Sequence, residues 1–260
     1  MKRTTYIILG TFIGGLVIMI VIIIVASLFG NKDVGDNYIK IGGVNETIEL
    51  QPCKVIKFNF DKISSPYYAN ISLNVDSAKA DKSSFSIPAD LKEHLTFKID
   101  KDTLNILFNF MAKDNRAEME RFVFVDSTML QLSIAKSVHT VINKIDGFDV
   151  AFKNLRRDSL CFNVENYATI ENCNISSLNA SARSLNIKSG SIKDLYLDCD
   201  YVRKWEINAK KIIVDVAHLC GSNRYCVDMS GVNEILWTPK TEGGNLVFED
   251  NESVKITRTK

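Results

Sequence analysis

Four charged residues in the C-terminal half have the types that cleavage of a glycosidic bond requires. Asp194, Asp198 and Asp200 lie close together, and Arg203 follows them. Some solenoid enzymes degrade polysaccharides with carboxylates and basic residues grouped on one outer face, because the reaction needs a paired acid and base. Acidic residues at outward strand positions more commonly form a solvated face. An enzymatic role therefore requires that several of these groups converge in a groove.

Other catalytic and cofactor chemistry has little support in the sequence. The histidines His94, His139 and His218 are widely separated, and only His218 has other candidate ligands nearby, Asp215 and Cys220. A zinc site needs three or four converging ligands. The chain has no G-x-S-x-G elbow, Walker loop or H-E-x-x-H motif. We therefore predict no catalytic residues, no metal and no cofactor.

Two small groups of side chains are candidates for other roles. Cys220 and Cys226 bracket the polar segment GSNRY and would close a short hairpin if they formed a disulfide in an oxidising compartment. Tyr201, Trp205 and Tyr225 are the candidate glycan or partner surface, because an aromatic face offers apolar contact to the C–H edges of a sugar. The competing interpretation places the tryptophan in the core or in a cap.

Short apolar triplets recur beyond Asp126 and predict stacked strands. Their central residues, among them Phe162, Ile170 and Leu178, recur at short intervals, with spacers rich in Asn, Ser, Asp and Lys. Strands this short form no core alone, but stacking aligns their inward triplets in one apolar column. The pattern predicts a β-solenoid over residues 127–257. A β-sandwich, whose strands recur at similar intervals, is the alternative.

Asparagine and proline positions favour the solenoid. Asparagine tolerates the left-handed backbone of a tight corner, and stacked amides hydrogen-bond along a column. Proline removes an amide proton from a sheet ladder, and none occurs between Pro88 and Pro239. Asparagines repeat beside the triplets at positions 163, 172, 186 and 208.

Residues 38–126 are predicted to form a β-rich lead. YIKIGG and ETIEL alternate apolar and polar residues around Gly42 and Gly43, which predicts a hairpin. The alternation continues in KVIKFNF, ANISLNVDSA, LTFKI and TLNILFNF, and PADLKEHL predicts one short helical turn. These features indicate an all-β chain with an antiparallel meander before the solenoid.

The sequence resembles a family of bacterial envelope proteins. The lead segments YIKIGGVNETIELQ and TLNILFNF, followed by repeats such as MLQLSIAKSVHTV and SLCFNVENYATIENCNISSLN, are similar to the putative auto-transporter adhesin, head GIN domain group. The likeness covers about residues 38–256. It implies a right-handed β-helix-like exported domain with an adhesin-like role, and it carries no established catalytic residues. The chain departs from the family by having charged or bulky residues where the family prefers Ser-Gly-Ala corners.

An uncharged stretch near the N-terminus predicts a membrane-spanning helix. It begins at Tyr6 and ends at Phe29, and as a helix it would reach about 36 Å, more than the ~30 Å hydrocarbon core. Lys2 and Arg3 precede it, so the positive-inside bias puts the N-terminus in the cytoplasm. A cleaved secretory signal is the alternative. The predicted organisation is a cytoplasmic segment 1–5, a signal-anchor helix 6–29, a linker 30–37, the lead 38–126 and the solenoid 127–257.

The charge balance excludes an electrostatically driven nucleic-acid binder. After the first thirty residues the chain carries 30 basic and 31 acidic side chains, and no basic cluster stands out. Nucleic-acid binders concentrate Lys and Arg on one face, because counterion release from phosphates drives their affinity. We expect the partners to be the membrane and a protein or glycan, and self-association remains open.

These observations favour one hypothesis and leave two alternatives. The favoured one is a non-enzymatic protein of the bacterial inner membrane with a single pass, whose solenoid in the periplasm or outside binds or adheres to a protein or glycan. The first alternative is a polysaccharide-acting enzyme on the same scaffold. The second is a self-assembling structural element resembling bactofilins, which requires a cytoplasmic domain.

Overall fold

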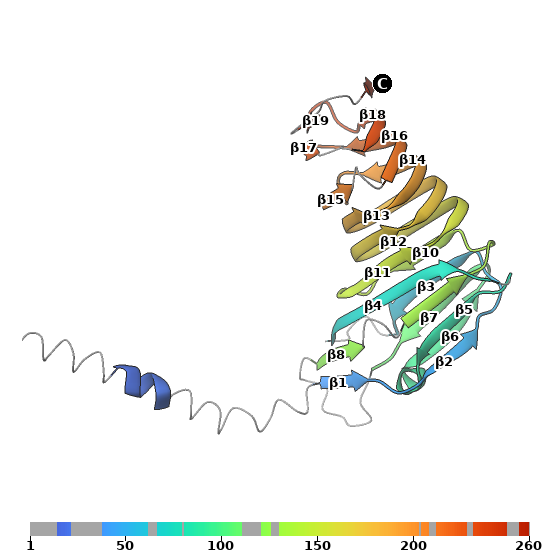
Figure 1. Ribbon diagram of the computed structural model, residues 1–260, viewed down its shortest axis with the longest axis vertical. Coiled ribbons are helices and arrows are strands. Elements are labelled where there is room, and N and C mark those ends of the chain that lie inside the picture. Colours follow the sequence, from blue (N-terminus) through green and yellow to red (C-terminus); the bar gives the residue numbers. More distant parts are fainter. Residues whose placement is uncertain are drawn as a thin grey trace, which may run out of the picture.

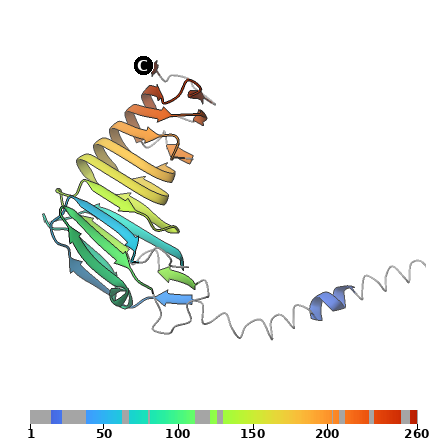
Figure 2. The same ribbon diagram turned by 180° about the vertical axis from the view of Figure 1, so that it is seen from behind.

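The computed structural model describes residues 15–21, 38–61, 67–79, 81–110, 121–125, 130–202, 204–207, 212–227, 231–248 and 255–259. Nearly all of its regular structure is β-strand (Figures 1 and 2). Most strands belong to one large sheet, and β17 and β19 form a separate pair. The elements in chain order are β1 (Tyr38–Ile41), β2 (Asn45–Glu49), β3 (Val55–Phe60), β4 (Tyr67–Ser77), β5 (Ser84–Pro88), the 3-10 helix η2 (Ala89–His94), β6 (Leu95–Asp100), β7 (Thr103–Phe108), β8 (Arg121–Val125), β9 (Leu130–Ile134), β10 (Thr140–Asn143), β11 (Phe148–Lys153), β12 (Arg156–Glu171), β13 (Cys173–Ile187), β14 (Gly190–Asp198), β15 (Lys204–Ile207), β16 (Ile212–Gly221), β17 (Arg224–Val227), β18 (Val232–Pro239), β19 (Asn245–Phe248) and β20 (Lys255–Arg258).

The C-terminal half is a stack of parallel coils, as the apolar triplets predict. Strands β12, β13, β14, β16, β18 and β20 follow one another up the stack in parallel register. Leu160 pairs with Leu178 and Leu178 pairs with Leu195, so these two successive coils are nearly equal in length. This confirms the β-solenoid and excludes the β-sandwich, whose strands would pair antiparallel.

Two apolar columns fill the interior of the stack. Each residue of a column pairs with one on the neighbouring rung, so apolar side chains stack on apolar side chains. All members of both columns are buried. The first column runs through Leu160, Leu178, Leu195, Ala217 and Ile235, and the second through Val75, Phe152, Ile170, Ile187 and Ile207.

One corner of the coil uses left-handed residues and an amide hydrogen bond. Asn154 and Asn172 have φ of 55° and 53°, and the Asn172 side-chain amide donates to Asn154 Oδ1 at 2.6 Å. One turn later Gly190 has φ of +121°, and a Cβ built there would lie 1.9 Å from the Cys173 carbonyl oxygen. The corner role predicted for Asn172 is confirmed, whereas Asn163 and Asn186 lie within strands and Asn208 lies outside the described residues.

The lead joins the stack directly. β3 and β4 pair in parallel with β10 and β11, so the coils continue across the predicted boundary at 126/127. Antiparallel pairing occurs between β2 and β5, β5 and β9, and β6 and β7. The hairpin predicted at Gly42 and Gly43 is wrong, because β1 pairs with β8 and β2 with β5. The helical turn predicted in PADLKEHL is present as η2.

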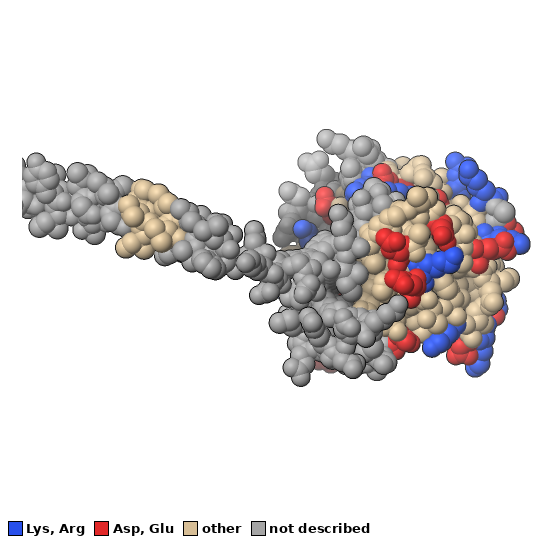
Figure 3. Space-filling model, turned by 90° about the horizontal axis from the view of Figure 1, so that it is seen from below, with Lys and Arg blue, Asp and Glu red and all other residues tan. Residues whose placement is uncertain are grey.

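The lower end of the stack, which β2, β5 and β6 cover in Figure 1, is charged but balanced. Three of its lysines lie 2.6–2.8 Å from carboxylates. Figure 3 shows acidic and basic side chains mixed over this end, with no large patch of one sign. The pairs are Lys54–Asp102, Lys82–Glu49 and Lys92–Glu46.

Much of the N-terminal region lies outside the described residues. Of the predicted span, only residues 15–21 are described, and they are helical. The segment 1–5 and the linker 30–37 are not among the described residues. No helix in the described part of the chain is both long enough and apolar enough to cross a membrane.

Candidate functional site

An enlarged loop between β14 and β15 marks the candidate site. Leu195 pairs with Ala217, so the coil that starts at Leu195 is longer than the two coils that precede it in the stack. The extra residues do not fit the coil, and they project Tyr201 from its outer surface with 67% of its area exposed. The loop is held as a turn, because the amides of Tyr201 and Val202 both donate to the Asp198 carbonyl at 3.0 Å.

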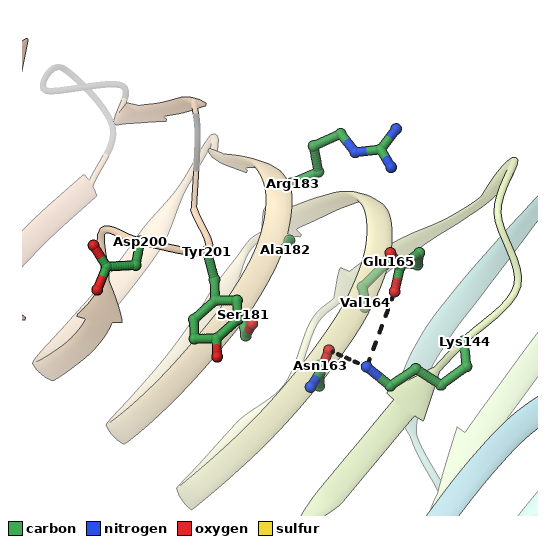
Figure 4. Close-up of a pocket in the computed structure, with 9 residues that line it drawn as sticks. All are labelled: Lys144, Asn163, Val164, Glu165, Ser181, Ala182, Arg183, Asp200 and Tyr201. Carbon is green, nitrogen blue, oxygen red and sulfur yellow. Dashed lines mark hydrogen bonds and ion pairs between the residues drawn. The ribbon is translucent and has the colours of Figure 1, made fainter. Parts of the chain in front are cut away.

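Beside Tyr201 lies a hollow of about 610 Å³, which we call the corner groove. It crosses neighbouring coils where their strands bend from one face to the next (Figure 4). The Tyr201 ring lies beside Ser181 of β13, and Lys144 extends toward Asn163 and Glu165 of β12, the neighbouring coil (Figure 4). The groove is lined by Lys144, Asn163, Val164, Glu165, Ser181, Ala182, Arg183, Asp200 and Tyr201.

The charges of the corner groove balance one another. Lys144 Nζ lies 3.1 Å from Asn163 Oδ1 and 4.0 Å from a Glu165 carboxylate oxygen. Arg183 lies 4.0 Å from Asp146 at the rim. The groove therefore offers hydroxyl, amide and paired charged groups beside one exposed aromatic ring. Such a lining suits a neutral ligand with many hydroxyl groups.

Asp200 is the centre of a hydrogen-bond network that ties three loops together. Its carboxylate accepts from the Tyr225 hydroxyl, from the Ser222 amide and hydroxyl at 2.9 Å each, and from Lys240 Nζ at 2.9 Å. The bond from Tyr225, followed by those from Ser222 and Lys240, holds the pKa of Asp200 well below its usual range. Lys240 also lies 2.5 Å from Asp198. That bond is the largest cause of the raised pKa of Lys240.

A second, smaller hollow continues from Asp200 toward the C-terminal coils. Its volume is about 450 Å³, and Tyr225 forms one wall. The ring of Tyr225 packs edge-on against Trp237 at 6.3 Å between centroids. Trp237 is buried. The hollow is lined by Cys199, Asp200, Val202, Ser222, Asn223 and Tyr225.

The structure brings two of the three predicted aromatic residues to one surface. Tyr201 and Tyr225 lie on either side of Asp200, which lines both hollows. Trp205 lies in β15, where it pairs with Leu185, but its side chain is outside the described residues.

The carboxylates predicted to face outward do so, and each has a partner. Asp194 Oδ1 lies 3.0 Å from His218 Nε2, and the His218 ring stacks on Tyr196 at 4.2 Å. Asp198 and Asp200 share Lys240, and Arg203 lies outside the described residues. A general acid needs a raised pKa, so the lowered pKa of Asp200 is unsuited to that role. No group of three or more metal-ligating side chains occurs within the described ranges.

Cys220 and Cys226 are both free thiols in the structure. Cys220 is half-buried, and its Sγ lies 3.8 Å from the Leu197 carbonyl oxygen. Cys226 is exposed in β17. The disulfide between them stays a prediction.

Several groove residues were not predicted from the sequence. Lys144 follows the end of β10, whereas Glu165 lies within β12 and Arg183 within β13. The apolar pattern does not distinguish these positions from other solvated ones. Lys240 lies far along the chain from Asp200, and no local pattern links the two. One signal in the sequence marks the position of the groove. The repeat length is uneven around Tyr201, which indicates extra residues that form a loop outside the regular coil.

Comparison with known proteins adds fold-level likeness only. No protein-family model matches the chain, so the resemblance to the GIN domain group stays a prediction. A search of curated proteins also finds no match. Similar solved structures include a putative adhesin from Bacteroides fragilis (TM-score 0.42, 12% identity, 85% of this chain and 100% of that one). Another is a putative adhesin from Parabacteroides merdae (TM-score 0.39, 12% identity, 85% of this chain and 98% of that one). A third is a putative lipid binding protein from Parabacteroides distasonis (TM-score 0.38, 12% identity, 85% of this chain and 99% of that one). These low scores leave the function to be argued from the site itself.

Proposed function

We propose that this chain is a non-enzymatic, membrane-anchored protein of the bacterial envelope whose corner groove binds a glycan. The observation that carries the proposal is the exposed Tyr201 ring beside a charge-balanced groove of about 610 Å³. A sugar presents hydroxyls to polar groups and C–H edges to an aromatic face, and the groove has both kinds of surface. Asp200 continues this polar surface toward Tyr225.

A binding role is favoured over catalysis because the nearby carboxylates are already engaged. Lys240 forms ion pairs with both Asp198 and Asp200, and three further donors hold Asp200 ionised. Cleavage of a glycosidic bond needs one carboxyl that stays protonated and one that is free to act as a base or nucleophile. The network instead fixes the loop that carries Tyr201.

Substitution of Tyr201 tests the binding role. Full-length protein in a mild detergent would be screened against a glycan panel, and the affinity of Tyr201→Ala for each ligand found would be measured by calorimetry. We expect about tenfold weaker binding, which corresponds to about 1.4 kcal/mol. Tyr167→Ala is the matched control, because Tyr167 is also exposed, at 53%, and lines neither hollow. Equal effects of the two substitutions, or no glycan ligand at all, would count against the proposal.

The anchor and the compartment are part of the same proposal. They rest on the uncharged stretch from Tyr6 to Phe29 and on the basic residues before it. A reporter fused to the C-terminus, active only outside the cytoplasm, tests the orientation. Reporter activity is expected. An inactive reporter would favour a cytoplasmic domain and the bactofilin-like alternative.

A further inference from the structure

Another groove lies at the start of β12 and β13, whereas the corner groove lies at the bend in the middle of these strands. This other groove has a volume of about 500 Å³ and forms where the chain enters β12 and β13, before the rungs that lead to the corner groove. We call it the basic groove. Every residue that lines it is polar or charged, so it offers no apolar side chain to an acyl tail or to a hydrophobic peptide anchor. The lining consists of Lys136, His139, Arg156, Arg157, Asp158, Ser159, Asn174 and Ser176.

The basic groove differs from the corner groove in its unbalanced charge. Lys136, Arg156 and Arg157 face a single acidic residue, Asp158. Among the described residues, no carboxylate lies within 4.0 Å of any of these three cations. Lys240 has carboxylate partners. Within the described part of the chain, the exposed Lys188 and Lys204 have none, but they line neither groove nor the smaller hollow beside Tyr225; in this groove three cations without such a partner lie together. An excess of positive charge in a hollow attracts anions and raises their local concentration.

Arg157 gives this charge a fixed position. Its guanidinium donates to the carbonyl oxygens of Ile134 at 2.7 Å, Ala135 at 2.9 Å and Val138 at 2.6 Å. These acceptors are neutral dipoles, so they hold the guanidinium without cancelling its charge. Burial lowers the pKa of Arg157, yet its pKa stays far too high for the group to lose its proton at neutral pH. The groove therefore contains one partly buried cation, Arg157, and two more exposed ones, Lys136 and Arg156.

Neutral donors surround the cations. Ser159 and Ser176 are exposed and offer hydroxyl groups. The Asn174 side-chain oxygen accepts from the Ser191 hydroxyl at 3.0 Å, which leaves the amide nitrogen of Asn174 to donate elsewhere. An oxyanion accepts several hydrogen bonds at once, and charge-assisted bonds from Lys and Arg are the strong ones.

The stacking of coils extends the basic surface along the solenoid. Ile175 pairs with Ile192 and Ser177 with Asp194, so exposed Lys193 lies one rung beyond Ser176. Adjacent strands are about 4.8 Å apart. Arg156 in β12 and Lys193 in β14 are two rungs apart, with β13 between them. A ligand that carries anionic groups along its length could therefore contact both cations.

We infer that the basic groove binds the oxyanion groups, carboxylate or sulfate, of an acidic polysaccharide. This site is separate from the corner groove and does not require that the corner groove bind a glycan. The all-polar lining disfavours a lipid, and the extension across rungs favours a polymer over a free anion.

Removal of the two exposed cations tests the inference. Binding of full-length protein to polygalacturonate, dextran sulfate and neutral dextran would be measured by biolayer interferometry at two salt concentrations. For Lys136→Ser combined with Arg156→Ser, we expect binding to at least one acidic polymer to weaken about tenfold or more, because two charge-assisted contacts are lost. The two acidic probes separate carboxylate from sulfate recognition. Neutral dextran should not bind at this site.

The matched control removes two positive charges elsewhere. Lys188 and Lys204 are exposed and line none of the hollows described above, so Lys188→Ser combined with Lys204→Ser should change the affinity by less than about twofold. Equal losses in the two double variants would mean that binding depends on total charge, and the inference would be wrong. It would also be wrong if neither acidic polymer bound. A third contrary result would be equal displacement of the polymer by millimolar inorganic phosphate and by free galacturonate, because the groove would then bind any small anion. Circular dichroism of each variant would verify that the fold is retained.

Discussion

Replacing Asn143 by leucine should destabilise the solenoid although the two side chains have the same number of heavy atoms and the same branching. Asn143 is completely buried at the end of β10, stacked between Phe58 and Val164. Its side-chain oxygen accepts from the Ile145 amide at 3.1 Å, and its side-chain nitrogen donates to the Phe148 carbonyl at 2.7 Å. The side chain therefore satisfies two backbone groups of the turn that leads into β11.

The expected loss follows from these two bonds. A leucine leaves the amide and the carbonyl without partners, and each orphaned buried group costs about 1–3 kcal/mol. Full burial of the leucine side chain offsets about 1.5–3 kcal/mol of this. At the middle of both ranges, about 4 kcal/mol is lost and about 2 kcal/mol is regained, so the net destabilisation should be about 2 kcal/mol.

Urea denaturation followed by tryptophan fluorescence would measure this loss, since Trp237 is buried in the folded chain. Asn179→Leu is the control, because Asn179 is exposed on the outer face of β13 and its replacement should change stability by less than about 0.5 kcal/mol. A loss below about 0.5 kcal/mol for Asn143→Leu would refute the reasoning.

Asn143→Asp gives a second measurement at the same position. A protonated carboxyl would keep both bonds, since its carbonyl oxygen accepts from Ile145 and its hydroxyl donates to Phe148. Burial would raise the folded pKa above that of the unfolded chain. The folded state would then hold more protons, so stability should be highest at low pH and fall as the pH rises through the folded pKa. Stability that rises with pH relative to wild type would contradict this account.

Three further predictions concern other parts of the fold. Gly190→Ala should prevent stable folding, because the new methyl would lie 1.9 Å from the Cys173 carbonyl oxygen; failure to see a lower melting temperature would contradict the packing of this corner. Because folding lowers the pKa of Asp200, its carboxylate stabilises the folded state above pH 3.8, and this contribution is lost as the pH falls further. In acid titrations, Asp200→Asn should therefore lose less stability below pH 3.8 than the wild type does. Cys226 is exposed and should react with iodoacetamide in the folded protein, whereas Cys199, whose burial raises its pKa to about 12, should react only after unfolding; mass spectrometry measures both.

The apolar pattern of the C-terminal half was sufficient to predict the solenoid. Side chains alternate between the two sides of a strand, so triplets such as that around Phe162 define an inner face without knowledge of any partner. The left-handed corner at Asn172 was also predictable, because asparagine tolerates that backbone conformation. These are local properties of the chain.

The lead was predicted less well, because alternation does not specify the neighbour of a strand. The segments around Gly42 and Gly43 have the pattern of a hairpin, yet β1 and β2 pair with β8 and β5. Likewise, β3 and β4 pair with β10 and β11, which come much later in the chain. Such pairings depend on the number of residues in each turn of the coil, and a short sequence segment does not specify that number.

The sequence by itself determined the uncharged N-terminal stretch, the β-solenoid class and the candidate tyrosines, because these follow from hydrophobic runs and short-range periodicity. Only the tertiary structure decided what surrounds Tyr201. Lys240 meets Asp200 from a distant part of the chain, and Lys144 meets Glu165 from a neighbouring coil. The physical reason is that stacking converts a separation of one turn into a distance of one rung, about 4.8 Å. Residues far apart in the chain therefore form each groove.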